Sequence, residues 1–202
     1  MKLYYMPGAC SLASHITLEW IGKPYETQRV SREEIKQPAY LALNPLGAVP
    51  VLTDGESTLT QSAAILEYLA ELSPEAGLVP EDVRERAEMR RWLGLCNADL
   101  HRTFGDVFAA PRLVQDETGR KELIANSSAK LVALFTVVDQ QLEGKQWVSG
   151  SRSIADPYLY TLLRWAKGKN IDIGHLKNLA AFSARMEADA GVQAALKTEG
   201  LA

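Results

Sequence analysis

The stretch LYYMPGACSLASHITL, residues 3–18, decides the fold of this chain. Its first residues are bulky and partly aromatic, which favours a β-strand. Pro7-Gly8 breaks that strand, and apolar residues at helical spacing follow, with Leu12 and Ile16 on one face. Cys10 therefore stands at a helix N-terminus, where unpaired backbone N–H groups and the helix dipole stabilise negative charge.

Two interpretations of Cys10 follow from this position. A thiol at a helix N-terminus can have a lowered pKa and ionise more readily, and the same N–H groups can hold the thiolate of a bound ligand. The alternative is that Cys10 is a small buried apolar residue.

A strand-helix-strand unit occupies the first thirty residues. The helix runs from Ser11 to about Ile21, where Gly22 ends it. Residues 25–30 alternate as in a partly exposed second strand. Two strands joined by a crossover helix should be parallel.

Residues 31–43 predict only one or two short helical turns, and a third strand, residues 49–53, follows them. Its proline cannot donate to a ladder, so Pro50 belongs at the strand's first residue or at an edge. The backbone of Val49 is then free to pair with an extended ligand, as in strand addition. A cis Val49–Pro50 bond would expose that backbone.

An antiparallel hairpin and a second helix complete this half of the chain. Asp54-Gly55 turns the third strand into a fourth, residues 57–60. Ser62 is a good N-cap for a helix over residues 63–72. Its hydroxyl and the N–H groups behind it can form a second anion site, although plain capping is the better explanation of a serine there when the position is considered alone.

The remainder of the chain is helical. Residues 74–81 have a linker composition with two prolines and a glycine, and no strand pattern follows. Ser153-Ile-Ala-Asp156 is a capping box that opens an apolar run.

The fold class is α/β plus all-α, with domains at 1–73 and 82–202. Helices are predicted over residues 83–108 (ended by Pro111), 118–142, 158–165, 176–190 and 192–198.

Composition narrows the functional classes. The chain has 202 residues, 47% of them hydrophobic, and a formal net charge of −3. This balance argues against nucleic acid or an anionic membrane as the main partner, and no apolar run could span a bilayer. Two cysteines make no disulfide framework, so a reducing cytoplasm is the default location. The three histidines lack metal-ligand spacing, and we expect no metal.

The ordered set of these features resembles the cytosolic glutathione transferases. The shared features are a thioredoxin-like βαβ-ββα domain, a proline opening the third strand, a Gln-Ser turn and an all-helical second domain. Residues 1–12, with His15 after them, are similar to the bacterial beta class. Further matching segments are residues 44–52, 59–62, 153–159 and 198–201.

This resemblance implies a homodimer that uses glutathione as co-substrate, with Cys10 and His101 as catalytic residues. Asp99 would reach glutathione from the partner subunit. The sequence departs from relatives in three ways. Gly94 replaces an asparagine, and Gln61 replaces a glutamate. The segment that contains Lys36, the candidate ligand of the glycine carboxylate, is shorter. The implied glutathione site comprises Tyr5, Ala9, Cys10, Lys36, Val49, Pro50, Gln61, Ser62 and Asp99, and the implied acceptor pocket Tyr5, Phe104, Phe108 and Trp165.

The resemblance implies conjugation of the glutathione thiolate to small electrophilic, largely apolar acceptors. One alternative is a glutathione-dependent thiol–disulfide or reductive-dehalogenation enzyme with Cys10 as the nucleophile. Position 13 is alanine, so only a monothiol cycle is open to it. A further alternative is a non-catalytic protein that binds apolar ligands.

Overall fold

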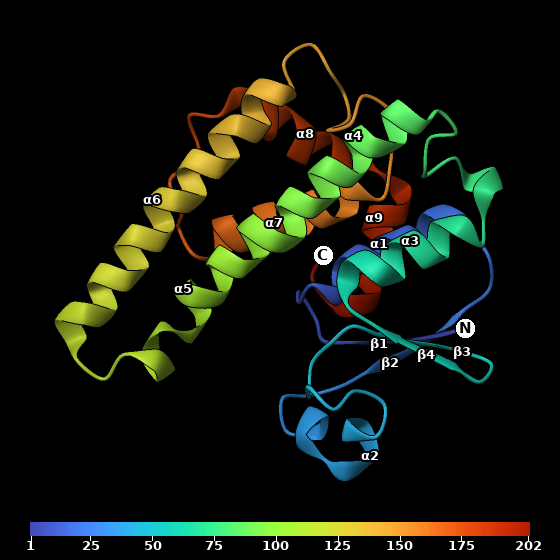
Figure 1. The fold of residues 1–202 in the computed structure, drawn as a ribbon, viewed down its shortest axis with the longest axis horizontal. Helices are drawn as coiled ribbons and strands as arrows, with labels where there is room; N and C mark the ends of the chain where they lie inside the picture. The colour runs from blue at the N-terminus through green and yellow to red at the C-terminus, as the bar shows by residue number, and fades with distance from the viewer.

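The first half of the chain forms a four-stranded sheet with helices against it (Figure 1). The computed structural model describes all residues 1–202. The strand order is β2-β1-β3-β4, with β2 parallel to β1 and the other neighbours antiparallel, which confirms the predicted βαβ unit and hairpin. The elements are β1 Lys2–Tyr5, α1 Ser11–Ile21, β2 Glu26–Arg29, a 3-10 turn Glu34–Lys36, α2 Pro38–Leu41, β3 Val51–Asp54, β4 Ser57–Thr60 and α3 Ser62–Glu71.

Helix α1 lies between the sheet and the helical half. Helices α1 and α3 cover one face of the sheet, and the segment with α2 lies on the other side (Figure 1). Every residue of α1 from Ser11 to Leu18 is buried, because the helix packs on both halves of the chain. Leu18 belongs to the small core against the sheet, whereas Leu12 and Ile16 belong to the large core of the helical half. This double packing fixes the N-terminus of α1, where Cys10 stands.

The second half is all helical, as predicted. Helices α5 and α6 form a long hairpin that projects from the body of the molecule, and α9 returns beside α1 (Figure 1). The elements are α4 Val83–Gly94, a π-helical segment Leu95–Leu100, α5 His101–Leu113, α6 Glu117–Gln141, α7 Ala155–Gly168, α8 Lys177–Ala188 and α9 Ala190–Glu199.

The long helix after residue 83 is present, but its predicted end was wrong and it contains a π turn that was not predicted. Pro111 does not end it: the proline lies inside α5, which continues to Leu113. A proline two residues before the end removes a single backbone hydrogen bond, so the last turn survives. The helix also widens into a π turn over Leu95–Leu100, and apolar periodicity does not reveal such an insertion.

The capping box before α7 is present in the structure. The backbone N–H of Ser153 donates to Asp156 Oδ2 at 2.8 Å, and the N–H of Val148 donates to Asp156 Oδ1 at 3.0 Å. Asp156 is fully buried, and this burial raises its pKa to about 7. The carboxyl group therefore joins the loop before α7 to the helix itself.

No helix of the protein is both long enough and apolar enough to cross a membrane. Cys10 and Cys96 are both buried and unpaired.

Candidate functional site

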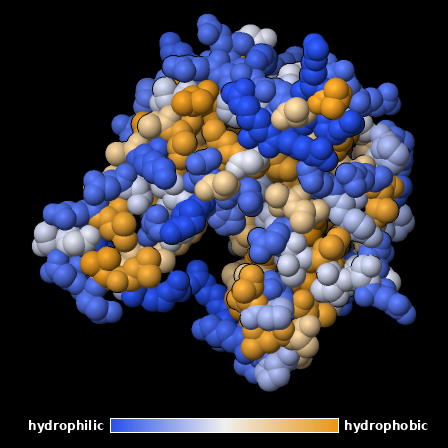
Figure 2. Space-filling model, viewed as in Figure 1, coloured by the Kyte–Doolittle hydropathy of each residue, from blue (hydrophilic) through white to orange (hydrophobic).

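A cavity of about 690 Å³ lies between the two halves of the chain. Its walls come from the N-terminus of α1, the segment before β3, the N-terminus of α3, the π segment, α5 and α7. Figure 2 shows the molecule hollowed between the tip of the α5–α6 hairpin and the α2 segment, with hydrophilic side chains along the rim. Seven predicted site residues line this cavity: Cys10, Lys36, Val49, Pro50, Gln61, Ser62 and His101.

Cys10 is the N-cap residue of α1, as predicted, but its thiol is not ionised more readily than usual. Burial raises the pKa of Cys10 above its ordinary value, and this effect outweighs hydrogen bonds from Ser62 and from backbone N–H groups, which lower it. The Sγ–H donates to the carbonyl oxygen of Val49 at 3.2 Å. Of the two interpretations of Cys10, the one with a lowered pKa is therefore not supported, because desolvation exceeds the helix-terminus effect.

The segments around Val49 and Gln61 present backbone to the cavity. The Val49–Pro50 bond is cis, and β3 begins after it at Val51, so the proline immediately precedes the strand instead of lying at its first residue. Gln61 has φ +72° and ψ 120°, a conformation that non-glycine residues rarely adopt and that clusters at ligand sites. Gln61, rather than the predicted Ser62, is the N-cap of α3, and Ser62 is the first helical residue.

His101 belongs to a hydrogen-bonded chain with two residues that the sequence did not single out as site residues. Its Nδ1 lies 2.6 Å from the Tyr158 hydroxyl oxygen, and that hydroxyl donates to Asn97 Oδ1 at 3.1 Å. The Tyr158 oxygen then accepts from Nδ1–H of His101, and this tautomer leaves Nε2 as a proton acceptor. Burial lowers the pKa of His101, so the ring is neutral near pH 7. All three residues line the cavity.

Asn97 and Tyr158 were missed for identifiable reasons. Asn97 lies in the π segment, and π turns inside helices occur frequently at functional sites. Tyr158 follows the capping box by two positions, and the sequence placed it only at the start of an apolar run. The cationic residues Arg32, Arg102 and Arg112, which also line the cavity, carried no sequence signal.

The predicted aromatic acceptor wall is present as a cluster beside the cavity, but it does not line it. The ring centroid of Trp165 lies 4.9 Å from that of His101 and 5.1 Å from that of Phe108. Phe104 is fully buried beneath them, whereas Phe108 is 43% exposed. Trp165 donates its Nε1–H to the carbonyl of Gly8 at 2.7 Å, so it holds the turn that leads to Cys10.

Tyr5 lies outside both predicted sites. It is buried with its ring against His15, and its hydroxyl reaches the carbonyl of Thr198 at 3.4 Å. The chain pairs Tyr5 with the C-terminal helix rather than with the cavity, and this pairing accounts for its burial.

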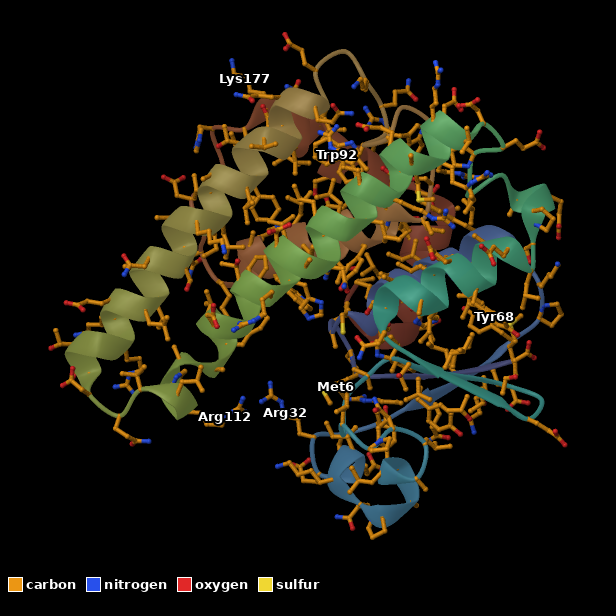
Figure 3. The ribbon with its side chains drawn as sticks, in the orientation of Figure 1. Met6, Arg32, Tyr68, Trp92, Arg112 and Lys177 are labelled. Carbon is orange, nitrogen blue, oxygen red and sulfur yellow. The ribbon has the colours of Figure 1, made fainter.

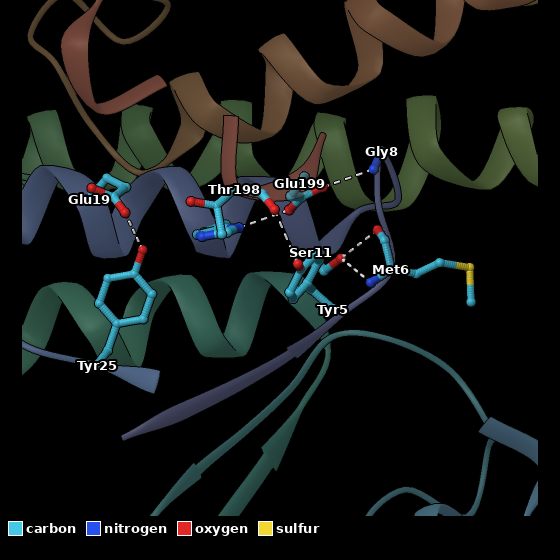
Figure 4. Close-up of polar contacts among 9 residues, drawn as sticks. Tyr5, Met6, Gly8, Ser11, Glu19, Tyr25, Thr198 and Glu199 are labelled. Carbon is cyan, nitrogen blue, oxygen red and sulfur yellow. Dashed lines mark hydrogen bonds and ion pairs between the residues drawn. The ribbon is translucent and has the colours of Figure 1, made fainter. Parts of the chain in front are cut away.

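The end of α9 is fastened to the turn before Cys10. The Gly8 N–H donates to Glu199 Oε2 at 2.8 Å (Figure 4). Glu199 Oε1 lies 2.9 Å from His15 Nδ1. The side chains of Glu199 and His15 are both completely buried. Gly8 has φ +70°, a backbone conformation that L side chains rarely adopt, so glycine is strongly favoured at this position.

The last two predicted residues are also outside the cavity of this chain. Ala9 lies in the turn, where its N–H donates to the Met6 carbonyl at 3.0 Å. Asp99 is exposed on the π segment. No group of three His, Cys, Asp or Glu side chains lies close enough together to hold a metal ion.

Comparisons with known proteins agree with this geometry. The sequence profile "Glutathione S-transferase, N-terminal domain" matches residues 1–71, and "Glutathione S-transferase, C-terminal domain" matches residues 106–190. The chain is 46% identical to Glutathione S-transferase GST-4.5 of Xanthomonas campestris pv. campestris, with all of both chains covered.

Solved structures give the same picture. A glutathione S-transferase from Xylella fastidiosa has a TM-score of 0.96 and 45% identity, and covers 100% of this chain and 99% of its own. A sphingomonad glutathione S-transferase complexed with glutathione and a bacterial beta class glutathione S-transferase of Sphingomonas chungbukensis each have a TM-score of 0.88 and 34% identity, with full coverage of both chains.

Proposed function

The chain belongs to the glutathione S-transferase family, in the bacterial beta class, and is an enzyme that conjugates glutathione; from this premise we propose how its own residues hold and activate that thiol. The supporting observation is that the Cys10 Sγ lies 3.2 Å from the Val49 carbonyl in a cavity that Ser62 and His101 also line. One ligand can therefore meet a thiol, a strand edge and a helix N-terminus together.

Glutathione is an extended peptide with a carboxylate at each end, and the cavity offers a partner for each part. The backbone of Val49 pairs with the cysteinyl unit, as in strand addition. The N-terminus of α3, at Gln61 and Ser62, takes the γ-glutamyl carboxylate, because unpaired N–H groups bind anions there. Lys36 takes the glycine carboxylate.

Activation of the thiol follows from the protonation states in the cavity. Cys10 stays protonated, since burial raises its pKa, and it can turn its S–H from the Val49 carbonyl to the glutathione sulfur. The neutral His101 accepts the glutathione proton at Nε2. The thiolate then attacks the electrophilic carbon of the acceptor, a new S–C bond forms, and the leaving group departs with the electron pair of the broken bond.

Mutation of Cys10 tests this proposal. Cys10→Ala should lower kcat/KM for conjugation about tenfold, because one hydrogen bond to a charged sulfur is lost. The matched control is Cys96→Ala, which removes a thiol that does not line the cavity. Full retention of both conjugation and calorimetric glutathione affinity in Cys10→Ala would show that Cys10 has no role.

Neither alternative function is favoured. The curated relatives are named as transferases. A Cys10 nucleophile would also need a lowered pKa, whereas burial raises it. Mass spectrometry after exposure to oxidised glutathione, with Cys10→Ser as control, would detect any monothiol cycle.

The assembly and location are part of the proposal. We place the enzyme in the cytoplasm, where thiols such as Cys10 and Cys96 stay reduced. We propose a homodimer, in which the exposed Asp99 of one subunit reaches the γ-glutamyl amine bound to the other. Domains 1–73 and 82–202, joined by residues 74–81, remain the proposed division.

A further inference from the structure

The cavity is lined by cations and by no anion. Four basic residues line it, and none of its lining residues is Asp or Glu. Arg102 is paired with Asp106 at 2.6 Å. The other three, Arg32, Lys36 and Arg112, belong to none of the ion pairs of the protein. An uncompensated positive field in a concave site attracts anions.

Two of these cations face each other across the cavity. Arg32 lies three residues after the end of β2, and Arg112 lies in the last turn of α5. Figure 3 shows their side chains pointing toward one another from the two halves of the molecule, and both line the same cavity. Like charges that face each other without a counter-ion repel, so a bound anion between them is stabilised.

Helix α5 connects this cationic end to the reacting end. His101, Phe108 and Arg112 are separated by seven and four residues, so they share one face of the helix. His101 and Arg112 are eleven residues apart, about 16 Å along the axis. Phe108 lies between them on the same face of α5. It does not line the cavity itself, but it is 43% exposed and offers apolar surface to the part of a ligand that extends beyond the cavity wall.

Glutathione does not use this end of the cavity. This step rests on the proposed function, in which the α3 N-terminus and Lys36 take the two glutathione carboxylates. Arg32 and Arg112 are then left for the second substrate. We propose that the acceptor is an anionic electrophile, whose apolar reactive body lies along α5 at Phe108 and whose carboxylate or similar acidic group binds Arg112 and Arg32.

A matched pair of acceptors tests the proposal. The probes are 4-chloro-3,5-dinitrobenzoate and its methyl ester, which share the ring and the chloride leaving group but differ in charge. In both reactions the glutathione S–C bond forms and chloride leaves. With rates corrected for the uncatalysed reaction, the intact enzyme should prefer the acid by about fivefold to tenfold in kcat/KM, and about 0.5 M salt should reduce that preference.

Variants assign the preference to the residues. Arg112→Gln should lower kcat/KM for the acid about tenfold and leave the ester and the glutathione KM unchanged. Arg84→Gln, an exposed arginine outside the cavity, is the matched control and should change nothing. Lys36→Gln should raise the glutathione KM with either acceptor.

The outcomes separate the two proposals. An equal rate for acid and ester in the intact enzyme, or an equal loss for both in Arg112→Gln, would overturn the anionic acceptor. An unchanged glutathione KM in Lys36→Gln would instead overturn the proposed glutathione site, even if the acid were preferred.

Discussion

Replacing Glu199 by alanine should destabilise the protein more than most single changes. The carboxylate is completely buried and has two partners, the Gly8 N–H at 2.8 Å and His15 Nδ1 at 2.9 Å. Its removal leaves the fully buried His15 Nδ1 without a partner and takes the acceptor from the part-buried Gly8 N–H. His15 Nε2 already has none, so the imidazole would then have no hydrogen bond at either nitrogen.

The magnitude follows from the burial of the pair. Breaking a fully buried pair by removing one member costs about 3 kcal/mol or somewhat more. For a chain of this length, each kcal/mol lowers the melting temperature by about 2–4 °C, so Glu199→Ala should melt about 6–12 °C lower. Because Gly8 leads into Cys10, we also expect a higher KM for glutathione.

Thermal unfolding and glutathione kinetics together check this prediction. Glu199→Gln, which keeps an acceptor for the Gly8 N–H, should lie between the alanine variant and the intact protein. Glu56→Ala removes an exposed carboxylate at the hairpin turn and should have no effect. A decrease of less than about 1 kcal/mol in the free energy of unfolding of Glu199→Ala would refute the reasoning, because breaking a buried pair costs more than that.

Three further outcomes are expected. Tyr158→Phe should lower kcat about fivefold to twentyfold with little change in glutathione KM, because His101 loses its only Nδ1 partner; an unchanged kcat would remove the tyrosine from the mechanism. In the free enzyme, iodoacetamide should alkylate Cys10 more slowly than glutathione near neutral pH, with a rate that still rises above pH 9, since burial raises the pKa; a plateau near neutral pH would contradict this. Burial raises the Asp156 pKa to about 7, above its unfolded value near 4, so its contribution to stability is full below about pH 4 and is lost as pH rises to 7. Because of this group, the free energy of unfolding of the intact protein should fall by about 2 kcal/mol between about pH 5 and 8. Asp156→Asn should abolish that part of the fall, as measured by urea unfolding; an identical pH dependence in both proteins would contradict it.

The sequence predicts well those parts of the site that local patterns control. The turn at Gly8, the helix that begins after Cys10 and the strand that begins after Pro50 each depend on a few consecutive residues. The structure brings these segments to one cavity, because a βαβ unit and a hairpin have few ways to pack. Cys10, Val49 and Ser62 could therefore be placed near each other from sequence alone.

The remainder depends on distant contacts. Glu199 and His15 are 184 positions apart, and no local pattern announces their pairing. The raised pKa of Cys10 depends on how deeply the packed helices bury it, and that depth is a property of the whole fold. Arg32 and Arg112 are likewise far apart in the sequence, so no local pattern shows that both line one cavity.

The π turn at Leu95–Leu100 determines the direction in which the side chains of α5 point relative to those of α4. A π turn holds one residue more than an α turn, and each residue of an α-helix advances the direction of its side chain by about 100°. The surplus residue thus rotates everything downstream relative to α4. His101 and Arg112, which line the cavity, owe their direction to that offset, so removing a single amino acid from the π turn would rotate both side chains away from the cavity without changing either residue.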